Sequence, residues 1–109
     1  MKYVSIWLGL AVLLLAAGPA MAQSKGDPAA GKDKAYQCMG CHGVKDYTNA
    51  YPTYNVPKVA GQRPQYIEKA LKEYRSGARK HPTMHAQASS LSDQDIRDIA
   101  AFFASEGPQ

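Results

Sequence analysis

The apolar positions along the chain predict three helices, and no segment alternates convincingly as a strand. The first helix is expected from Pro28 to about Gln37, because Asp27 suits the N-cap and proline suits the first helical position. The second is expected from Pro64 to Gly77. Its apolar face repeats at the helical period and is formed by Ile67, Ala70, Leu71 and Tyr74. The pattern predicts an all-α fold.

The third helix has the clearest signals. Ser92 is its expected N-cap, and Asp95 three residues later makes a near match to a capping box. Leu91 before the cap and Ile96 after it can form a hydrophobic staple. The buried face is expected from Ile96, Ile99, Ala100 and Phe103. Gly107, followed by proline, ends the helix.

Two long segments without helical spacing lie between these helices. Residues 42–63 contain prolines and asparagines typical of turns, and residues 77–91 are also expected to be irregular. Long loops are uncommon in a small domain unless they serve a function, and a small domain often needs a cofactor to complete its core. We therefore expect the loops to wrap a large, flat, apolar group.

The start of the chain has the three parts of a secretory signal peptide. Lys2 supplies a positive charge, Ile6–Ala17 is a short apolar run, and Ala20-Met21-Ala22 has the form of a cleavage site. Cleavage after Ala22 would remove residues 1–22 and leave 23–109 as one domain in a bacterial periplasm. The alternative is an uncleaved membrane anchor, although the run is shorter than the roughly 18 apolar residues of a membrane span.

Composition excludes several other classes of protein. The 109 residues carry 13 Lys+Arg against 9 Asp+Glu, and 45% are hydrophobic, unlike a highly charged disordered tail or a collagen-like repeat. The length argues against a multi-domain enzyme. Two cysteines are too few for a disulfide scaffold. No basic run with interleaved aromatic residues indicates binding to nucleic acid.

Both cysteines belong to one motif. Cys38-Met39-Gly40-Cys41-His42 has the C-x-x-C-H spacing of covalent c-type haem attachment. Each thiol can add to one haem vinyl group, and the histidine can then ligate the iron. A dithiol redox site is one alternative, but it usually lies in a βαβ unit that this sequence lacks. Zinc is the other, but a fourth ligand is missing and adjacent Cys41 and His42 suit a tetrahedral site poorly.

Met84 is the predicted second axial ligand of the iron. Of the four methionines, two leave with the signal peptide and Met39 lies between the attachment cysteines. His85 is the alternative and would give an iron of lower potential, whereas His81 is expected to be a solvated loop residue. An empty sixth position would instead suggest gas binding or peroxidase chemistry.

With these motifs the sequence resembles the class I c-type cytochromes, and is most similar to the group of cytochromes c4 and small monohaem periplasmic cytochromes. The segments that carry the resemblance are Ala30–Lys32, Cys38–Gly43, Val56–Gln62, Tyr66–Tyr74, Met84 and Leu91–Phe103. The resemblance implies a small class I cytochrome c fold, with three main helices and long loops around one covalently attached haem c. Cytochromes c4 carry two such domains, whereas this chain has one motif, which fits a single-haem relative or a dimer.

The resemblance also assigns roles to individual residues. Cys38 and Cys41 match the attachment positions, and His42 and Met84 match the axial ligands. Pro57 matches a proline whose carbonyl accepts a hydrogen bond from the proximal histidine, although it could simply stiffen the loop.

The first and last helices cross in this family. Gly31 and Tyr36 are therefore expected to pack against Phe102 and Phe103.

These features predict a periplasmic electron carrier without enzymatic activity. It would pass one electron at a time between redox proteins, possible partners being a cytochrome reductase complex and a terminal oxidase. The alternatives are a haem subunit of a larger oxidoreductase and a haem enzyme with an open iron site. Tyr47, Tyr51 and Tyr54 are candidates to contact the haem propionates. Docking through a basic surface is expected from Lys32, Lys34, Lys45, Lys58, Lys69, Lys72, Arg75, Arg79 and Lys80.

Overall fold

The computed structural model describes residues 25–44 and 56–107, and these residues form five helices without a β-strand. The helices are α1 (Pro28–Lys34), α2 (Tyr36–His42), α3 (Pro64–Ser76), α4 (Pro82–Ala88) and α5 (Asp93–Ser105). The all-α class is therefore confirmed. The predicted signal peptide and the tyrosines at 47, 51 and 54 lie outside the described residues.

Two predicted boundaries are wrong. The first predicted helix is two helices, because Ala35 has φ −83° and ψ 2° and separates α1 from α2. The segment 77–91, expected to be irregular, contains α4. This helix has only seven residues, fewer than the window over which helical periodicity can be recognised. Pro82 at its first position was the available signal.

The helix ends follow the sequence signals closely. The Asp27 carboxylate accepts a hydrogen bond from the backbone N–H of Ala29 at 2.9 Å. Ser92 and Asp95 form a complete capping box at the start of α5. Gly77 ends α3 with φ 83°, in the left-handed region that glycine adopts without strain.

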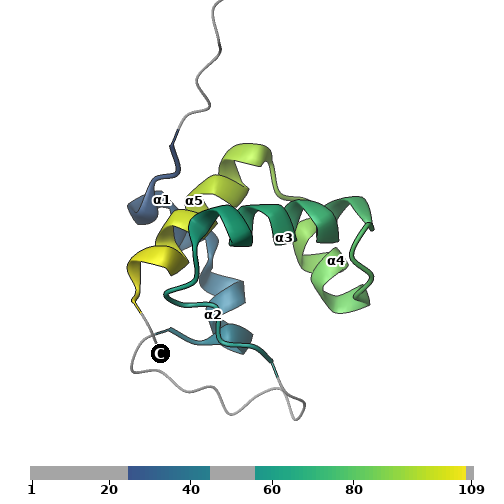
Figure 1. Cartoon of the computed structure of the whole chain (residues 1–109), viewed down its shortest axis with the longest axis horizontal. Coiled ribbons are helices and arrows are strands. Elements are labelled where there is room, and N and C mark those ends of the chain that lie inside the picture. Colours follow the sequence, from purple (N-terminus) through teal and green to yellow (C-terminus); the bar gives the residue numbers. More distant parts are fainter. Residues whose placement is uncertain (1–24, 45–55, 108–109) are drawn as a thin grey trace, which may run out of the picture.

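The core is built around α5, which buries Ile96, Ile99, Ala100, Phe102 and Phe103. Helices α1 and α3 both pack on α5, and α4 packs on α3. Figure 1 shows α1 and α5 crossing at one side of the molecule and α4 at the C-terminal end of α3. Among the described helices, α2 packs only on α1.

The crossing of α1 and α5 brings two backbones into direct contact. A Cβ atom at Gly31 would overlap the carbonyl oxygen of Asp98 and lie 2.8 Å from Cβ of Phe102. The expected packing of Gly31 is thus confirmed. Tyr36, expected at the same crossing, is instead 78% exposed, and its neighbour Ala35 is fully buried.

A buried carboxylate fastens the same crossing. Asp98 is 3% exposed and accepts hydrogen bonds from the backbone N–H of Asp27 at 2.8 Å, Lys34 Nζ at 2.6 Å and Gln94 Nε2 at 2.7 Å. Lys34 also pairs with Asp95 at 2.8 Å. The Asp27 N–H, followed by Lys34, lowers the pKa of Asp98. A buried carboxylate with several partners avoids the cost of an unpaired charge.

Within residues 25–44 and 56–107, none of the helices combines the length and the apolar character that crossing a membrane requires.

The contact at Gly31 predicts a strong effect of one added methyl group. Gly31→Ala should lower the free energy of unfolding of the haem-loaded protein by about 2 kcal/mol or more, since α1 must move away from α5. Urea denaturation measures the change. Lys32→Ala, at an exposed position of the same helix, is the control and should change stability little. Equal stabilities of Gly31→Ala and wild type would contradict the close contact.

The lysine–carboxylate cluster predicts acid sensitivity. Lys34 is the main cause that lowers the pKa of Asp95 from 3.8 to about 2. A carboxylate whose pKa is lower in the folded than in the unfolded chain stabilises the fold at pH values above the unfolded pKa. This stabilisation is lost as the pH falls from about 4 to about 2. Lys34→Gln should therefore make the free energy of unfolding depend less on pH in this range, as measured by urea denaturation at several pH values. Lys32→Gln should keep the wild-type dependence, and a Lys34→Gln curve parallel to wild type would refute the assignment.

Candidate functional site

A cavity of about 480 Å³ lies among α2, α3, α4, α5 and the segment that precedes α3. This volume is typical of sites for small molecules and cofactors. Ile67, Leu71, Ile99 and Phe103 give it apolar walls from α3 and α5. The hydrophobic core is thus incomplete around a space that a large apolar group could fill.

Helix α2 brings the motif residues to this cavity. Cys38 and Cys41 are three positions apart, which places their side chains on one face of the helix. Both line the cavity together with His42. Cys38 is partly buried, Cys41 is exposed, and neither forms a disulfide.

The His42 ring is oriented by a backbone carbonyl. Its Nδ1 lies 2.6 Å from the carbonyl oxygen of Pro57, so Nδ1–H donates, and in the neutral form of the ring the lone pair is then on Nε2. The segment that carries Pro57 is itself anchored, because the N–H of Gly61 donates to the carbonyl of Phe103 at 2.8 Å. A neutral imidazole held in this way is suited to bind a metal through Nε2.

Met84 reaches the cavity from α4. It is partly buried and lines the cavity, whereas His85 is not among the lining residues. The Nδ1–H of His85 donates to the carbonyl of Tyr74 at 2.8 Å. This arrangement favours Met84 over His85 as the residue facing a group in the cavity.

His81 has a more specific place than the solvated loop position that we expected. It is exposed, but its Nδ1 accepts a hydrogen bond from the N–H of Met84 at 3.2 Å and so caps α4. It also lines the cavity.

The Cys38 thiol does not have the character of a redox-active cysteine. Burial raises the pKa of the Cys38 thiol. Reactive cysteines of C-x-x-C redox sites have lowered pKa values, which keep the thiolate available. The structure therefore gives no support to the dithiol alternative.

Arg79 is a residue at the cavity whose place the sequence did not indicate. Its guanidinium carbon lies 5.3 Å from the ring centre of Tyr74 and 5.8 Å from that of Tyr66, and all three residues line the cavity. The spacing of the two tyrosines, eight residues apart on α3, was the only available signal, since it puts both rings on one helix face.

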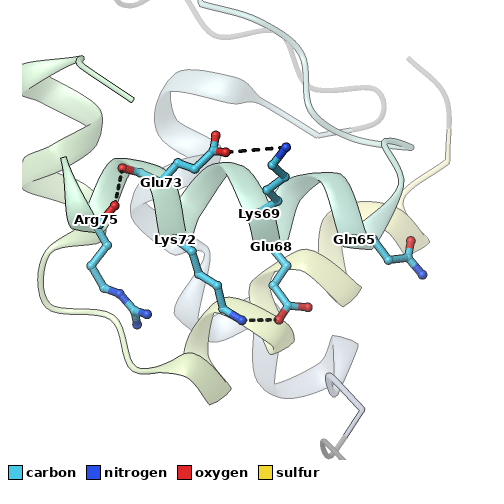
Figure 2. A pocket seen from close by; sticks show the side chains of 7 residues that line it. Gln65, Glu68, Lys69, Lys72, Glu73 and Arg75 are labelled. Atoms are coloured by element: carbon cyan, nitrogen blue, oxygen red, sulfur yellow. Dashed lines mark hydrogen bonds and ion pairs between the residues drawn. The ribbon is translucent and has the colours of Figure 1, made fainter. Parts of the chain in front are cut away.

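The outer face of α3 has a second hollow, but its charged groups pair with each other. Figure 2 shows Lys72 bound to Glu68 and Lys69 to Glu73, at 2.7 and 3.7 Å. Much of the expected basic surface is therefore neutralised. Of the docking residues that the structure describes, three form no ion pair, namely Lys32, Lys58 and Lys80.

A family model described as cytochrome c matches residues 28–106. The chain belongs to the cytochrome c family. It is 42% identical to cytochrome c4 of Pseudomonas aeruginosa, over 89% of this chain and 47% of that protein. It is 44% identical to cytochrome c-554(548) of Halomonas halodenitrificans, over 74% of this chain and 98% of that protein.

A third relative is the cytochrome subunit of sulfide dehydrogenase of Chlorobaculum tepidum, 31% identical over 88% of this chain and 92% of that protein. The chain spans about half the length of the cytochromes c4 that it matches. The prediction of a class I c-type cytochrome of the c4 group is confirmed. So is covalently bound haem c.

The residues at the cavity fit this cofactor. Two thiols on one helix face can form two thioether bonds, and an imidazole with an occupied Nδ1 can ligate iron. A thioether lines the same cavity from another helix. The apolar walls suit the flat porphyrin surface.

The size of the cavity predicts that folding depends on haem. Without the haem, the apolar walls of the cavity would face water at a cost of about 5 kcal/mol, a large part of the stability of a typical domain. The double variant Cys38→Ser/Cys41→Ser, produced without haem, should show no cooperative thermal transition by circular dichroism. The haem-loaded wild type is the control and should unfold cooperatively. A haem-free chain that unfolds as cooperatively as the control would show that the core is complete without the cofactor.

Proposed function

We propose that this cytochrome is a periplasmic one-electron carrier. Cys38 and Cys41 attach its haem, and His42 and Met84 are the axial ligands of the iron. The observation that carries the proposal is that a single apolar cavity is lined by an oriented imidazole and a methionine thioether from different helices. When bound, the haem supplies an iron that gains and loses one electron.

The surrounding residues favour the reduced, less charged state of such a centre. The hydrogen bond from His42 to Pro57 fixes the tautomer and orientation of the imidazole. A methionine ligand raises the reduction potential relative to a second histidine. The apolar side chains of Ile67, Leu71 and Phe103 disfavour extra positive charge in the cavity and act in the same direction.

We further propose that residues 1–22 are a signal peptide cleaved after Ala22 and that 23–109 form one monohaem domain in the periplasm. The charged start, the short apolar run and the A-x-A site support export. The match to cytochrome c-554(548) over nearly the whole of that protein supports a domain that can stand alone.

The donor and acceptor are expected to be redox proteins that dock weakly and in a salt-dependent way. A cytochrome reductase complex and a terminal oxidase are candidates. Lys58 lines the cavity and forms no ion pair within the described part of the chain, so its charge is available to an acidic partner surface.

A second candidate function is that of a haem subunit in a larger oxidoreductase. The observation that favours it is the similarity to the cytochrome subunit of sulfide dehydrogenase, which covers most of both chains. Purification of the native protein with a salt wash distinguishes the two functions. A subunit should keep its catalytic partner at a fixed stoichiometry, whereas a free carrier should be released.

An open iron site is the remaining alternative. It is disfavoured by the position of Met84, whose partly buried side chain lines the cavity.

The axial ligands are tested by near-infrared absorption of the ferric haem-loaded protein. Wild type should show a methionine-sulfur-to-iron charge-transfer band, and Met84→Ala should lose it, because no other methionine of the described residues is free to serve as the second ligand. His85→Asn is the matched control: its amide can still donate to the Tyr74 carbonyl, so the band should remain. If the band persists in Met84→Ala, or is lost in His85→Asn alone, the assignment of Met84 is wrong.

A further inference from the structure

Arg79 is a charged side chain at an apolar cavity, and the proposed electron transfer gives it no role. Besides stacking on the rings of Tyr66 and Tyr74, it is bound twice to Glu73. Its Nε lies 3.3 Å from the Glu73 carboxylate, and its backbone N–H donates to the Glu73 carbonyl at 3.1 Å. Arg79 therefore folds the segment after α3 back onto that helix.

This segment is the connection between α3 and α4. It begins at Gly77, which ends α3 in the left-handed conformation, and leads to His81, which caps α4. Helix α4 has seven residues, too few to be stable in isolation. Among the described helices it packs only on α3, so its position depends on the contacts it makes there.

Tyr74 joins Arg79 to α4. Its carbonyl accepts the hydrogen bond from His85, and its ring meets the His81 ring edge to face, with centroids 6.1 Å apart. Tyr74, which lies under the Arg79 guanidinium, thus contacts His81 and His85, and these two histidines lie on either side of Met84 in the sequence. The two tyrosines also raise the pKa of Arg79, and its guanidinium is charged at neutral pH.

We propose that Arg79 is a positioning residue for Met84. Its stack on Tyr74 and Tyr66 holds α4 against α3 and keeps the Met84 side chain at the cavity, which limits the access of external ligands to the iron. This inference rests on the proposed ligation by Met84. In the open state α4 moves away from α3 and Met84 leaves the iron. Cation–π contacts at partly buried sites are strong enough that their loss would change the equilibrium between the closed and open states about tenfold.

Imidazole binding to the ferric haem-loaded protein tests the proposal. Imidazole can bind only when Met84 leaves the iron, so its apparent affinity follows the population of the open state. Arg79→Gln should bind imidazole about tenfold more tightly than wild type and should show a weaker methionine-to-iron band. Arg79→Lys keeps a cation over the rings and should stay within about threefold of wild type.

Two control variants separate this role from simpler ones. Lys80→Gln removes the same charge from the next, exposed position and should leave imidazole affinity unchanged. Arg75→Gln removes a bond from α3 to the Leu91 carbonyl and an ion pair with Asp93, away from the cavity. It should lower thermal stability without tightening imidazole binding.

The outcomes are distinct. A wild-type protein without the methionine band would overturn both the proposed ligation and the role of Arg79. With the band present, wild-type affinity in Arg79→Gln would overturn only the role of Arg79. An equal increase of imidazole affinity in Arg79→Gln and Arg75→Gln would also overturn the role of Arg79, because it would show that any loss of stability exposes the iron.

Discussion

The backbone contact between α1 and α5 at Gly31 is the constraint on which the rest of the fold depends. It fixes α5, and Asp98 fastens the crossing with hydrogen bonds to α1 and its cap. From α5, the carbonyl of Phe103 holds the segment that contains Pro57 through the N–H of Gly61. That segment in turn orients His42. The contact between α1 and α5 is thus linked to His42, the proposed proximal ligand, by one backbone hydrogen bond and one hydrogen bond from the imidazole to a backbone carbonyl.

Much of this arrangement could be predicted from the sequence because the signals are local. Caps at Asp27 and Ser92 depend on side chains that bond to nearby backbone, and the C-x-x-C-H spacing is set by the chemistry of attachment. The break at Ala35 and the short helix α4 depend on tertiary packing, which overrides weak local preferences. The place of Arg79 could not be read from the sequence, because it depends on how the chain turns back after α3.

Many charges in the described part of the chain are paired within the structure. Lys34 pairs with Asp95 and Asp98, and on α3 lysines pair with glutamates one turn away. Excess positive charge in the composition is therefore a poor guide to a docking surface. Lys58 lies beside the cavity and forms no ion pair within residues 25–44 and 56–107, so it has a clearer relation to the cofactor than the more numerous lysines of α3.

Helix α2 carries the attachment motif, yet the only described helix on which it packs is its neighbour α1. Cys41 remains exposed although Cys38 is partly buried. Among the described helices, the one that carries the proposed attachment residues is therefore the least enclosed by the others. For biogenesis, the exposed Cys41 on a weakly enclosed helix leaves the attachment motif accessible to a maturation enzyme, and the arriving haem then completes the core on which cooperative folding depends.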